Sequence, residues 1–234
     1  MSQAPKPTES PTQLMLVLEA GAGAAERLAA ALRSAPIASV VVEPAGGRTL
    51  DAATAAPLVA AIQKANAAAL ISGDALLART LTADGVHLPS GDTLDAVYGD
   101  ARETLGNRFV VGIDAGASRH DAMSMGEAGA EYIGFGLPNV AATAAARMRE
   151  SASEGQSKTA IEERLDLIAW WAEVFEVPCV AFDVTTTDEA RALAEAGADF
   201  IAIRIAAAET PASTQDTVRA FSKAIASAER AGQG

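Results

Sequence analysis

The chain has 234 residues and a formal net charge of −12, and half of its residues are hydrophobic although only 4% are aromatic. A field of that sign repels phosphate polymers and anionic lipid surfaces, so we expect neither nucleic-acid nor membrane partners. No apolar stretch approaches the ~20 residues that a membrane helix needs. Cys179 is the only cysteine, so an internal disulfide is excluded and a cytoplasmic location is expected.

Short β-branched runs alternate with Ala-rich runs along the chain, which is typical of βαβ units around a parallel sheet. The β-branched runs predict strands at 14–19, 37–43, 68–72, 85–88, 109–113, 132–137, 178–183 and 200–205. Helices are expected at 24–34, 51–66, 75–82, 94–105, 119–128, 158–175, 187–196 and 215–230. Eight such units predict an α/β fold of the (β/α)8 TIM-barrel type, with a doubly wound open sheet as the alternative.

The same pattern predicts the domain organisation. Residues 1–12 are polar and Pro-rich, and we expect them to form a disordered N-terminal tail. Residues 13–231 are expected to form one TIM-barrel domain. Its long loop at 138–157 carries Arg147 and Arg149 and is interpreted either as a mobile lid or as a surface segment without a role.

A weak internal repeat supports a modular barrel. The segments TADGVHL, AGAEYIGFG and AGADFIAIR begin near residues 82, 128 and 196 and share one layout. In each segment small residues end a helix, an acidic residue follows, and a strand begins. Successive βα units of one barrel are expected to repeat in this way.

Acidic residues recur where the predicted strands end, which is the end of such barrels that carries the chemistry. They are Glu19, Glu43, Asp74, Asp92, Asp114 and Asp183. Crowded carboxylates need a cation, shared protons or solvent between them, and Mg²⁺ prefers such oxygen ligands. The alternative is that each acid caps the helix that follows it or is solvated. His87, near the end of the fourth strand, is interpreted either as an acid–base group or as a satisfied core residue.

Phosphate capture would need cations or the N–H groups that open a helix. Gly46-Gly47-Arg48 after the second strand is one candidate. After the seventh strand, Asp183 would repel a phosphate, whereas the Thr185 hydroxyl could donate a hydrogen bond. Arg204 on the eighth strand is the best cation nearby if it points inward, and the alternative is a salt bridge with Asp183.

Five segments occur in the order and spacing of a known family: ADGVHLPSGDTL, VVGIDAGAS, GEAGAEYIGFGLPN, VPCVAFDV and EAGADFIAIRIA. Over roughly residues 14–230 the chain resembles the thiamine phosphate synthases and the related thiazole tautomerases. The resemblance implies a barrel enzyme that joins an aminopyrimidine diphosphate to a thiazole phosphate, so a phosphorylated small molecule is the expected partner. It also implies Mg²⁺ as cofactor, which assists the departure of diphosphate while a pyrimidine carbocation forms.

The resemblance also implies roles at the matching positions. Asp92 matches the family's acidic metal ligand, and Ser72-Gly73 falls on an Asn-Asp pair, with Asp74 one place later. Only Arg48 could replace a basic cluster after the second strand, and Lys158 could replace a lysine after the sixth. A Gly-Gly pair that holds phosphate in the family has become Phe182-Asp183. These changes fall on the charge clamp and the phosphate cradle, so catalysis is expected to be weakened.

The resulting expectations divide into three roles. The catalytic candidates are Lys158, Arg48 and His87, and the metal ligands are Asp92 and Asp74. Substrate or phosphate contacts are expected from Ser72, Asp74, Asp114, Asn139, Asp183, Thr185 and Arg204.

Three functional hypotheses remain open. An active synthase with a rebuilt clamp requires Arg48, Lys158 and Arg204 to point into one pocket with Asp92. A different small-molecule enzyme on the same barrel is the second. The third is a non-catalytic paralogue that binds a thiamine-pathway ligand or a protein partner, with the acids paired within their own barrel. Trp170 and Trp171, on the helix expected at 158–175, are interpreted either as packing that helix on the barrel or as part of an interface in a homo-oligomer.

Overall fold

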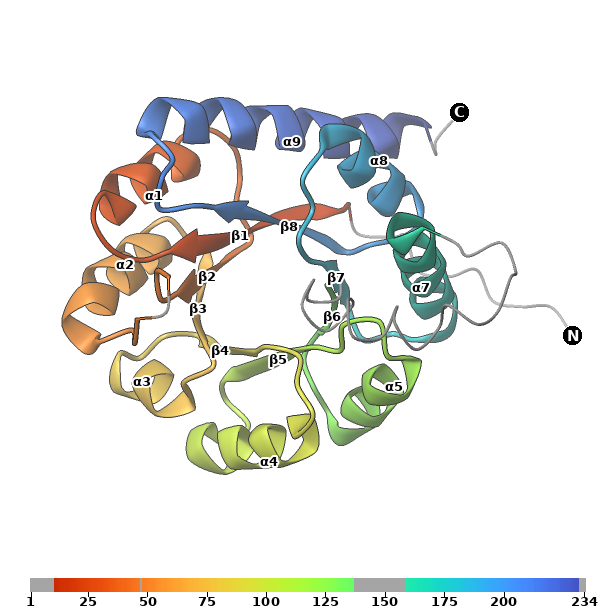
Figure 1. Cartoon of the computed structure of the whole chain (residues 1–234), viewed down its shortest axis with the longest axis horizontal. Coiled ribbons are helices and arrows are strands. Elements are labelled where there is room, and N and C mark those ends of the chain that lie inside the picture. Colours follow the sequence, from red (N-terminus) through yellow and green to blue (C-terminus); the bar gives the residue numbers. More distant parts are fainter. Residues whose placement is uncertain (1–10, 47, 137–158, 232–234) are drawn as a thin grey trace, which may run out of the picture.

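The computed structural model describes residues 11–46, 48–136 and 159–231. Its strands form a closed parallel barrel in chain order, with helices outside the ring (Figure 1). The strands are β1 Gln13–Glu19, β2 Ser39–Glu43, β3 Ala68–Ser72, β4 Gly85–Leu88, β5 Val110–Asp114, β6 Ile133–Phe135, β7 Cys179–Ala181 and β8 Phe200–Ile205. Because β8 pairs with β1, from Gln13 opposite Phe200 to Leu18 opposite Ile205, the predicted TIM barrel is confirmed and the open sheet is wrong.

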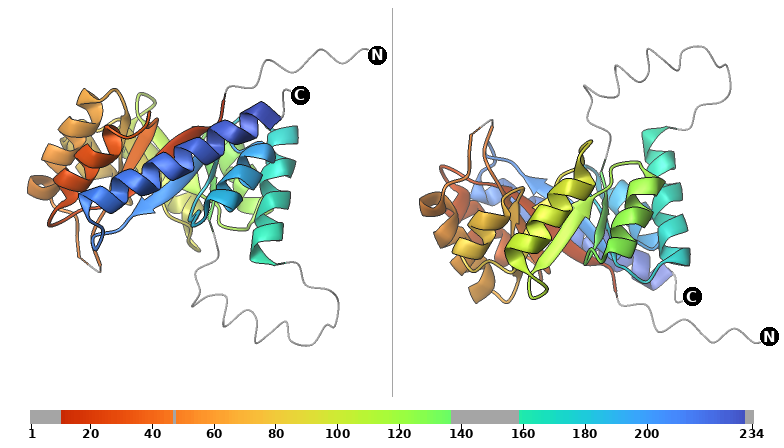
Figure 2. Two further views of the ribbon diagram at one scale, coloured as in Figure 1. Left: turned by 90° about the horizontal axis from the view of Figure 1, so that it is seen from above. Right: turned by 90° about the horizontal axis from the view of Figure 1, so that it is seen from below.

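Each described connection between strands contains a helix. The helices are α1 Ala24–Leu32, α2 Ala52–Lys64, α3 Ala75–Thr80, α4 Leu94–Leu105, α5 Arg119–Ala128, α7 Ala160–Val174, α8 Thr187–Glu195 and α9 Pro211–Ala231. Helix α9 packs against both α1 and α8 and closes the outer ring. It runs along the upper edge of the molecule in Figure 1 and crosses the front of the molecule when seen from above (Figure 2, left). Within the described ranges, no helix has both the length and the apolar character needed to cross a bilayer.

The expected tail and loop fall largely on residues that the structure does not describe. Residues 1–10 of the predicted N-terminal tail and the whole of the predicted loop at 138–157 lie outside the described ranges. The lid interpretation of that loop, with Arg147 and Arg149, therefore stays a prediction.

Aromatic side chains occupy part of the barrel interior, and glycines on neighbouring strands make room for them. The interior cluster consists of Met15, Val17, Val41, Leu70, Tyr132, Val180, Phe182 and Ala202. A Cβ atom on Gly112 would lie 1.9 Å from the Tyr132 ring, and one on Gly134 would lie 2.7 Å from the Phe182 ring. Real atoms do not approach so closely, so these two glycines allow large rings inside a barrel of short strands.

The tryptophan pair of α7 packs against the protein itself. Trp171 is fully buried, stacks on Phe175 with ring centroids 4.0 Å apart, and donates from Nε1 to the Val177 carbonyl at 2.7 Å. The half-buried Trp170 lies under the guanidinium of Arg119, 4.2 Å from its ring centroid. Trp171 therefore belongs to the core, and only Trp170 keeps any surface for the predicted oligomer contact.

The acidic residue of the internal repeat has a structural role. Asp84, Glu131 and Asp199 precede β4, β6 and β8, and each side chain accepts a backbone N–H from the strand before its own. The donors are Ala69 at 2.8 Å, Val111 at 2.7 Å and Cys179 at 2.8 Å. The three carboxylates, here called the strand staples, join neighbouring strands at the N-terminal end of the barrel.

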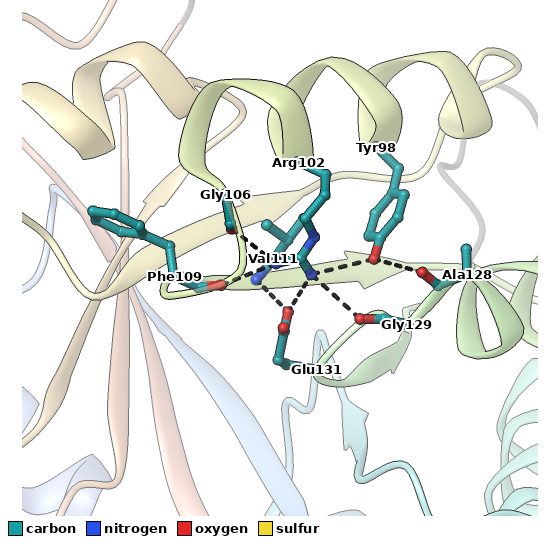
Figure 3. A network of polar contacts seen from close by, with 8 residues as sticks. All are labelled: Tyr98, Arg102, Gly106, Phe109, Val111, Ala128, Gly129 and Glu131. Atoms are coloured by element: carbon teal, nitrogen blue, oxygen red, sulfur yellow. Dashed lines mark hydrogen bonds and ion pairs between the residues drawn. The ribbon is translucent and has the colours of Figure 1, made fainter.

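The Glu131 staple is reinforced by a polar network (Figure 3). Arg102 on α4 donates to Glu131 Oε2 at 2.7 Å, to the Tyr98 hydroxyl at 3.2 Å, and to three backbone carbonyls. The Tyr98 hydroxyl in turn donates to the Ala128 carbonyl at 3.2 Å. This network ties the end of α4 to the starts of β5 and β6.

Candidate functional site

The C-terminal ends of the strands carry most of the predicted site residues, because parallel strands end on the same side of a barrel. Glu19, Glu43 and Arg204 lie on β1, β2 and β8, and Asp114 ends β5. Asp183 follows β7 by two residues. We call this end of the barrel the rim.

The Arg204 side chain points toward Glu43 on β2 and Glu19 on β1 rather than toward Asp183. Its Nη1 atom lies 2.5 Å from Glu43 Oε2 and 3.6 Å from Glu19 Oε1, and its side chain is 41% exposed. Burial would lower the pKa of Arg204, but the hydrogen bond and charge of Glu43, with Asp183 and Glu19 further away, raise it above the usual value. Arg204 is therefore a permanently charged group that two carboxylates already neutralise.

Arg27 on α1 holds the backbone at Glu19 in this part of the rim through a hydrogen bond. It was not identified from the sequence as a site residue. It is buried and donates to the carbonyls of Glu19 at 2.9 Å, Ala22 at 3.0 Å and Ala207 at 3.2 Å. Glu19 Oε2 also accepts from the Ala207 N–H at 2.8 Å. The available signal was a single arginine on the otherwise Ala- and Leu-rich buried face of α1.

Asp114 and Asp183 form a second group of carboxylates at the rim. A Cβ atom on Gly136 would lie 2.8 Å from Asp114 Oδ2 and 3.2 Å from Asp183 Oδ2, so both oxygens face one small volume. Asp183 has a left-handed backbone with φ 55°, which turns its side chain away from the path of β7. Burial raises the pKa of Asp114, as does the charge of Asp183, while N–H donors from Gly116 and Gly136 act in the opposite direction.

A buried ion pair holds the turn that follows β7. Arg164 on α7 bonds to the Phe182 carbonyl and to Glu189 Oε1 on α8. Glu189 Oε2 accepts from the Thr185 N–H at 3.1 Å, and the Thr186 side chain caps α8 by accepting from the Glu189 N–H. The Thr185 side chain is therefore exposed to solvent on a turn that Arg164 and Glu189 hold in place. Arg164 was also missed, and its signal was again one arginine on a buried helix face.

The predicted metal ligands lie in the loops after β3 and β4. Asp74 is exposed and caps α3, accepting from the Leu77 N–H at 2.8 Å through Oδ1, so its capping alternative is correct. Asp92 is exposed, and Ser72 is half-buried opposite His87 in the register of β3 and β4. No group of three or more His, Cys, Asp or Glu side chains poised for a metal occurs in the described part of the chain. Mg²⁺ commonly uses one or two carboxylates with waters and substrate phosphates, and the exposed Asp92 and the second oxygen of Asp74 stay its predicted ligands.

His87 lies in the barrel core. It is 5% exposed, its Nδ1 atom is 2.9 Å from the Tyr132 hydroxyl, and its ring stacks on Phe182 with centroids 4.6 Å apart. Burial lowers the pKa of His87 to about 4, so the ring is neutral at pH 7. A neutral ring already bonded to Tyr132 matches the alternative of a satisfied core residue, and we leave His87 out of the proposed site.

The remaining cations are only partly described. Arg48 is exposed in the loop after β2, two residues after Gly46, whose φ is 36°. Lys158 and Asn139 lie outside the described residues, as does Gly47 of the Gly46-Gly47-Arg48 loop. The predicted convergence of Arg48, Lys158 and Arg204 on Asp92 therefore stays a prediction, although Arg204 itself faces Glu43 and Glu19.

Charge decides what the described rim can do. The guanidinium of Arg204 is paired with Glu43 and Glu19, while Asp114 and Asp183 form a separate pair of carboxylates, so these described rim residues carry a net negative charge. Such a surface stabilises positive charge that develops on a bound molecule. It repels phosphate groups unless a metal ion or other basic side chains accompany them.

Comparison with known proteins finds sequence relatives along most of the chain. The family model described as thiamine monophosphate synthase matches residues 14–207. A curated thiamine-phosphate synthase from Erythrobacter litoralis is 37% identical over 226 residues, which cover 94% of this chain and 99% of that protein. Another, from Rhodospirillum centenum, is 34% identical over 142 residues and 61% of each chain.

A solved structure supports the fold independently. The thiamine phosphate pyrophosphorylase from Pyrococcus furiosus superposes with a TM-score of 0.67 at 17% identity, over 92% of this chain and 96% of that one. At this identity the likeness concerns the barrel alone.

Proposed function

We propose, since the chain belongs to the thiamine monophosphate synthase family, that it is a thiamine phosphate synthase-type transferase with a modified rim. Its reaction would join an aminopyrimidine diphosphate to a thiazole phosphate and release diphosphate. The observation that carries this proposal is the end-to-end match to a curated thiamine-phosphate synthase at 37% identity.

The charges of the rim suit two separate tasks in this reaction, stabilisation of a positive fragment by carboxylates and binding of a phosphate group by Arg204. Loss of diphosphate leaves a positive aminopyrimidine fragment, and the facing carboxylates of Asp114 and Asp183 would stabilise that charge. Arg204 would bind a phosphate group only by leaving Glu43 and Glu19. The exposed Thr185 hydroxyl would add a neutral donor. Because Arg204 must first exchange partners, we propose that turnover is weaker than a preformed clamp would give.

Mg²⁺ fits this scheme through Asp92, with the second oxygen of Asp74 as a further ligand. When bound there, it would neutralise charge on the departing diphosphate. Arg48, exposed in the loop after β2, and Lys158 are the cations that we propose to complete the clamp, with Ser72 and Asn139 as polar contacts.

One observation favours a second candidate, a non-catalytic protein that binds a thiamine-pathway ligand. Arg204 is occupied by Glu43 and Glu19, and one oxygen of Asp74 is occupied by the cap of α3. A rim whose charged groups already satisfy one another can hold a ligand without supplying the electrostatic stabilisation that catalysis needs.

The test is an assay of the full chain with the aminopyrimidine diphosphate, the thiazole phosphate and Mg²⁺, which measures thiamine phosphate formation. If the proposal is correct, Asp92→Ala lowers kcat/KM by about 100-fold or more, since one electrostatic contact contributes ~3 kcal/mol to a transition state. Asp95→Ala, at an exposed aspartate of the adjoining helix α4, is the matched control and retains activity.

Binding measurements separate the two candidates. Turnover that Asp92→Ala abolishes supports the synthase. Calorimetric binding of either precursor without turnover supports the non-catalytic candidate. Neither binding nor turnover in the wild-type protein rejects both.

A further inference from the structure

The described residues also form a pocket of about 640 Å³ at the N-terminal end of the barrel, opposite the rim. Its floor reaches the barrel interior at Met15, Leu70, Tyr132 and Val180, and Ala226 of α9 lies in its wall. The volume falls within the range of small-molecule sites, which spans roughly 300–1,000 Å³. None of the rim residues of the proposed active site lines it.

The lining has a definite chemical character. Apolar side chains form the floor, and no lysine, arginine or histidine occurs among the lining residues. Glu131 is the single charged residue of the lining. Its contacts with Arg102 and with the Val111 N–H both use Oε2, so Oε1 keeps its capacity to accept a hydrogen bond.

We propose that this pocket is a second, non-catalytic binding site for a compact aromatic or aliphatic molecule with a cationic or neutral hydrogen-bond donor. The apolar body would displace water from the half-buried Val110, Pro178 and Phe200, and its donor would face Glu131. Anions are disfavoured because the lining offers them no lysine, arginine or histidine, and because they would meet Oε1 of Glu131, whose other oxygen is paired with Arg102. The proposal does not depend on the reaction at the rim.

Two probes that share a ring and differ in charge test this proposal. Tryptamine carries an ammonium group and indole-3-acetate a carboxylate, and both are titrated into the full chain by calorimetry. Because the whole protein is negative, the titrations are made at about 0.15 M salt, where the Debye length is ~8 Å. We expect tryptamine to bind one site at least tenfold more tightly than indole-3-acetate.

Substitutions locate the site. Ala226→Phe fills the pocket from α9 and should weaken tryptamine binding at least tenfold, whereas Ala220→Phe, exposed on the same helix and outside the lining, should not. Glu131→Gln should reduce the preference between the two probes. The proposal is overturned if the full chain does not bind tryptamine, or if Ala226→Phe binds it as the wild type does. Equal affinity for both probes also overturns the charge assignment.

Discussion

At the scale of single residues, the rim is governed by the partners of Arg204. A guanidinium shared by Glu43 and Glu19 is held in place and is already neutralised. An anionic ligand must therefore compete with two carboxylates before it can use this cation. The affinity of the rim for phosphate groups then depends on residues that need not touch the ligand.

Removing one competitor should increase that affinity. We expect Glu43→Gln to tighten binding of inorganic diphosphate by about three- to tenfold, because Arg204 loses its nearest carboxylate, 2.5 Å away. Glu26→Gln makes the same charge change on the exposed surface of α1 and should have little effect. Calorimetry at constant ionic strength measures the difference, and an equal effect of both substitutions would rule out a direct role for Glu43.

His87 should make stability depend on pH. Its pKa in the folded protein is lowered to about 4 from 6.5 by burial, so the unfolded chain binds a proton first as the pH falls. The contribution to stability is fully present above about pH 6.5, declines toward about pH 4, and amounts to ~3 kcal/mol. Urea unfolding across this range measures it. His87→Gln can still bond to Tyr132 but does not titrate, so parallel pH profiles for the two proteins would contradict the assignment.

Sequence reasoning could place these residues but could not choose their partners. Asp183 was the expected alternative partner of Arg204 because β7 and β8 are neighbours. In the structure their pairing ends with Ala181 opposite Ile201, and the left-handed backbone of Asp183 turns it toward Gly136. Arg204 lies beyond that pairing and meets carboxylates from β1 and β2 instead. Neither the early end of β7 nor the turn at Asp183 is encoded in local hydrophobicity.

At the scale of elements, each strand staple adds a side-chain hydrogen bond at the N-terminal end of the barrel, where its own backbone N–H already donates to the residue that it accepts from. We expect Asp199→Ala to lower the free energy of unfolding by ~1–3 kcal/mol, since it leaves the Cys179 N–H without its 2.8 Å acceptor. Asp199→Asn keeps an oxygen acceptor and should cost less. Asp100→Ala, exposed on α4, is the control in denaturant titrations, and an equal loss there would contradict the staple.

The elements themselves follow closely from sequence because the strands are buried on both faces and read as apolar runs. The predicted start of the last helix at residue 215 was wrong, because α9 begins at Pro211. Thr210 accepts from the Ser213 N–H at 3.2 Å, and a proline fits the first turn of a helix, so the Thr-Pro-Ala-Ser signal was present. The acids of the internal repeat were visible too, but their reach to the previous strand requires the closed barrel.

At the scale of the whole molecule, the barrel separates two chemically different ends. The rim gathers carboxylates around Arg204, whereas the opposite end holds an apolar pocket with Glu131 in its wall. Both ends lie within a protein of net charge −12, which repels itself and any approaching anion.

Salt should therefore stabilise this protein. Raising NaCl from about 10 to about 200 mM shortens the Debye length from ~30 Å to below 8 Å and screens the repulsion among carboxylates. We expect the Tm at pH 7 to rise by roughly 2–4 °C, equivalent to ~1 kcal/mol for a chain of this size. Differential scanning calorimetry measures the change, and a lower Tm at high salt would mean that specific ion pairs outweigh net charge.

The strand staples have one consequence for how the molecule can be divided. Each reaches back from the start of an even-numbered strand to the odd-numbered strand before it. A cut after β4 or β6 keeps every such carboxylate in the same fragment as its amide, whereas a cut after β3, β5 or β7 separates one pair. The strands β3–β4, β5–β6 and β7–β8 are thus joined as modules of two, and the junctions after β4 and β6 are where split halves should reassemble most readily.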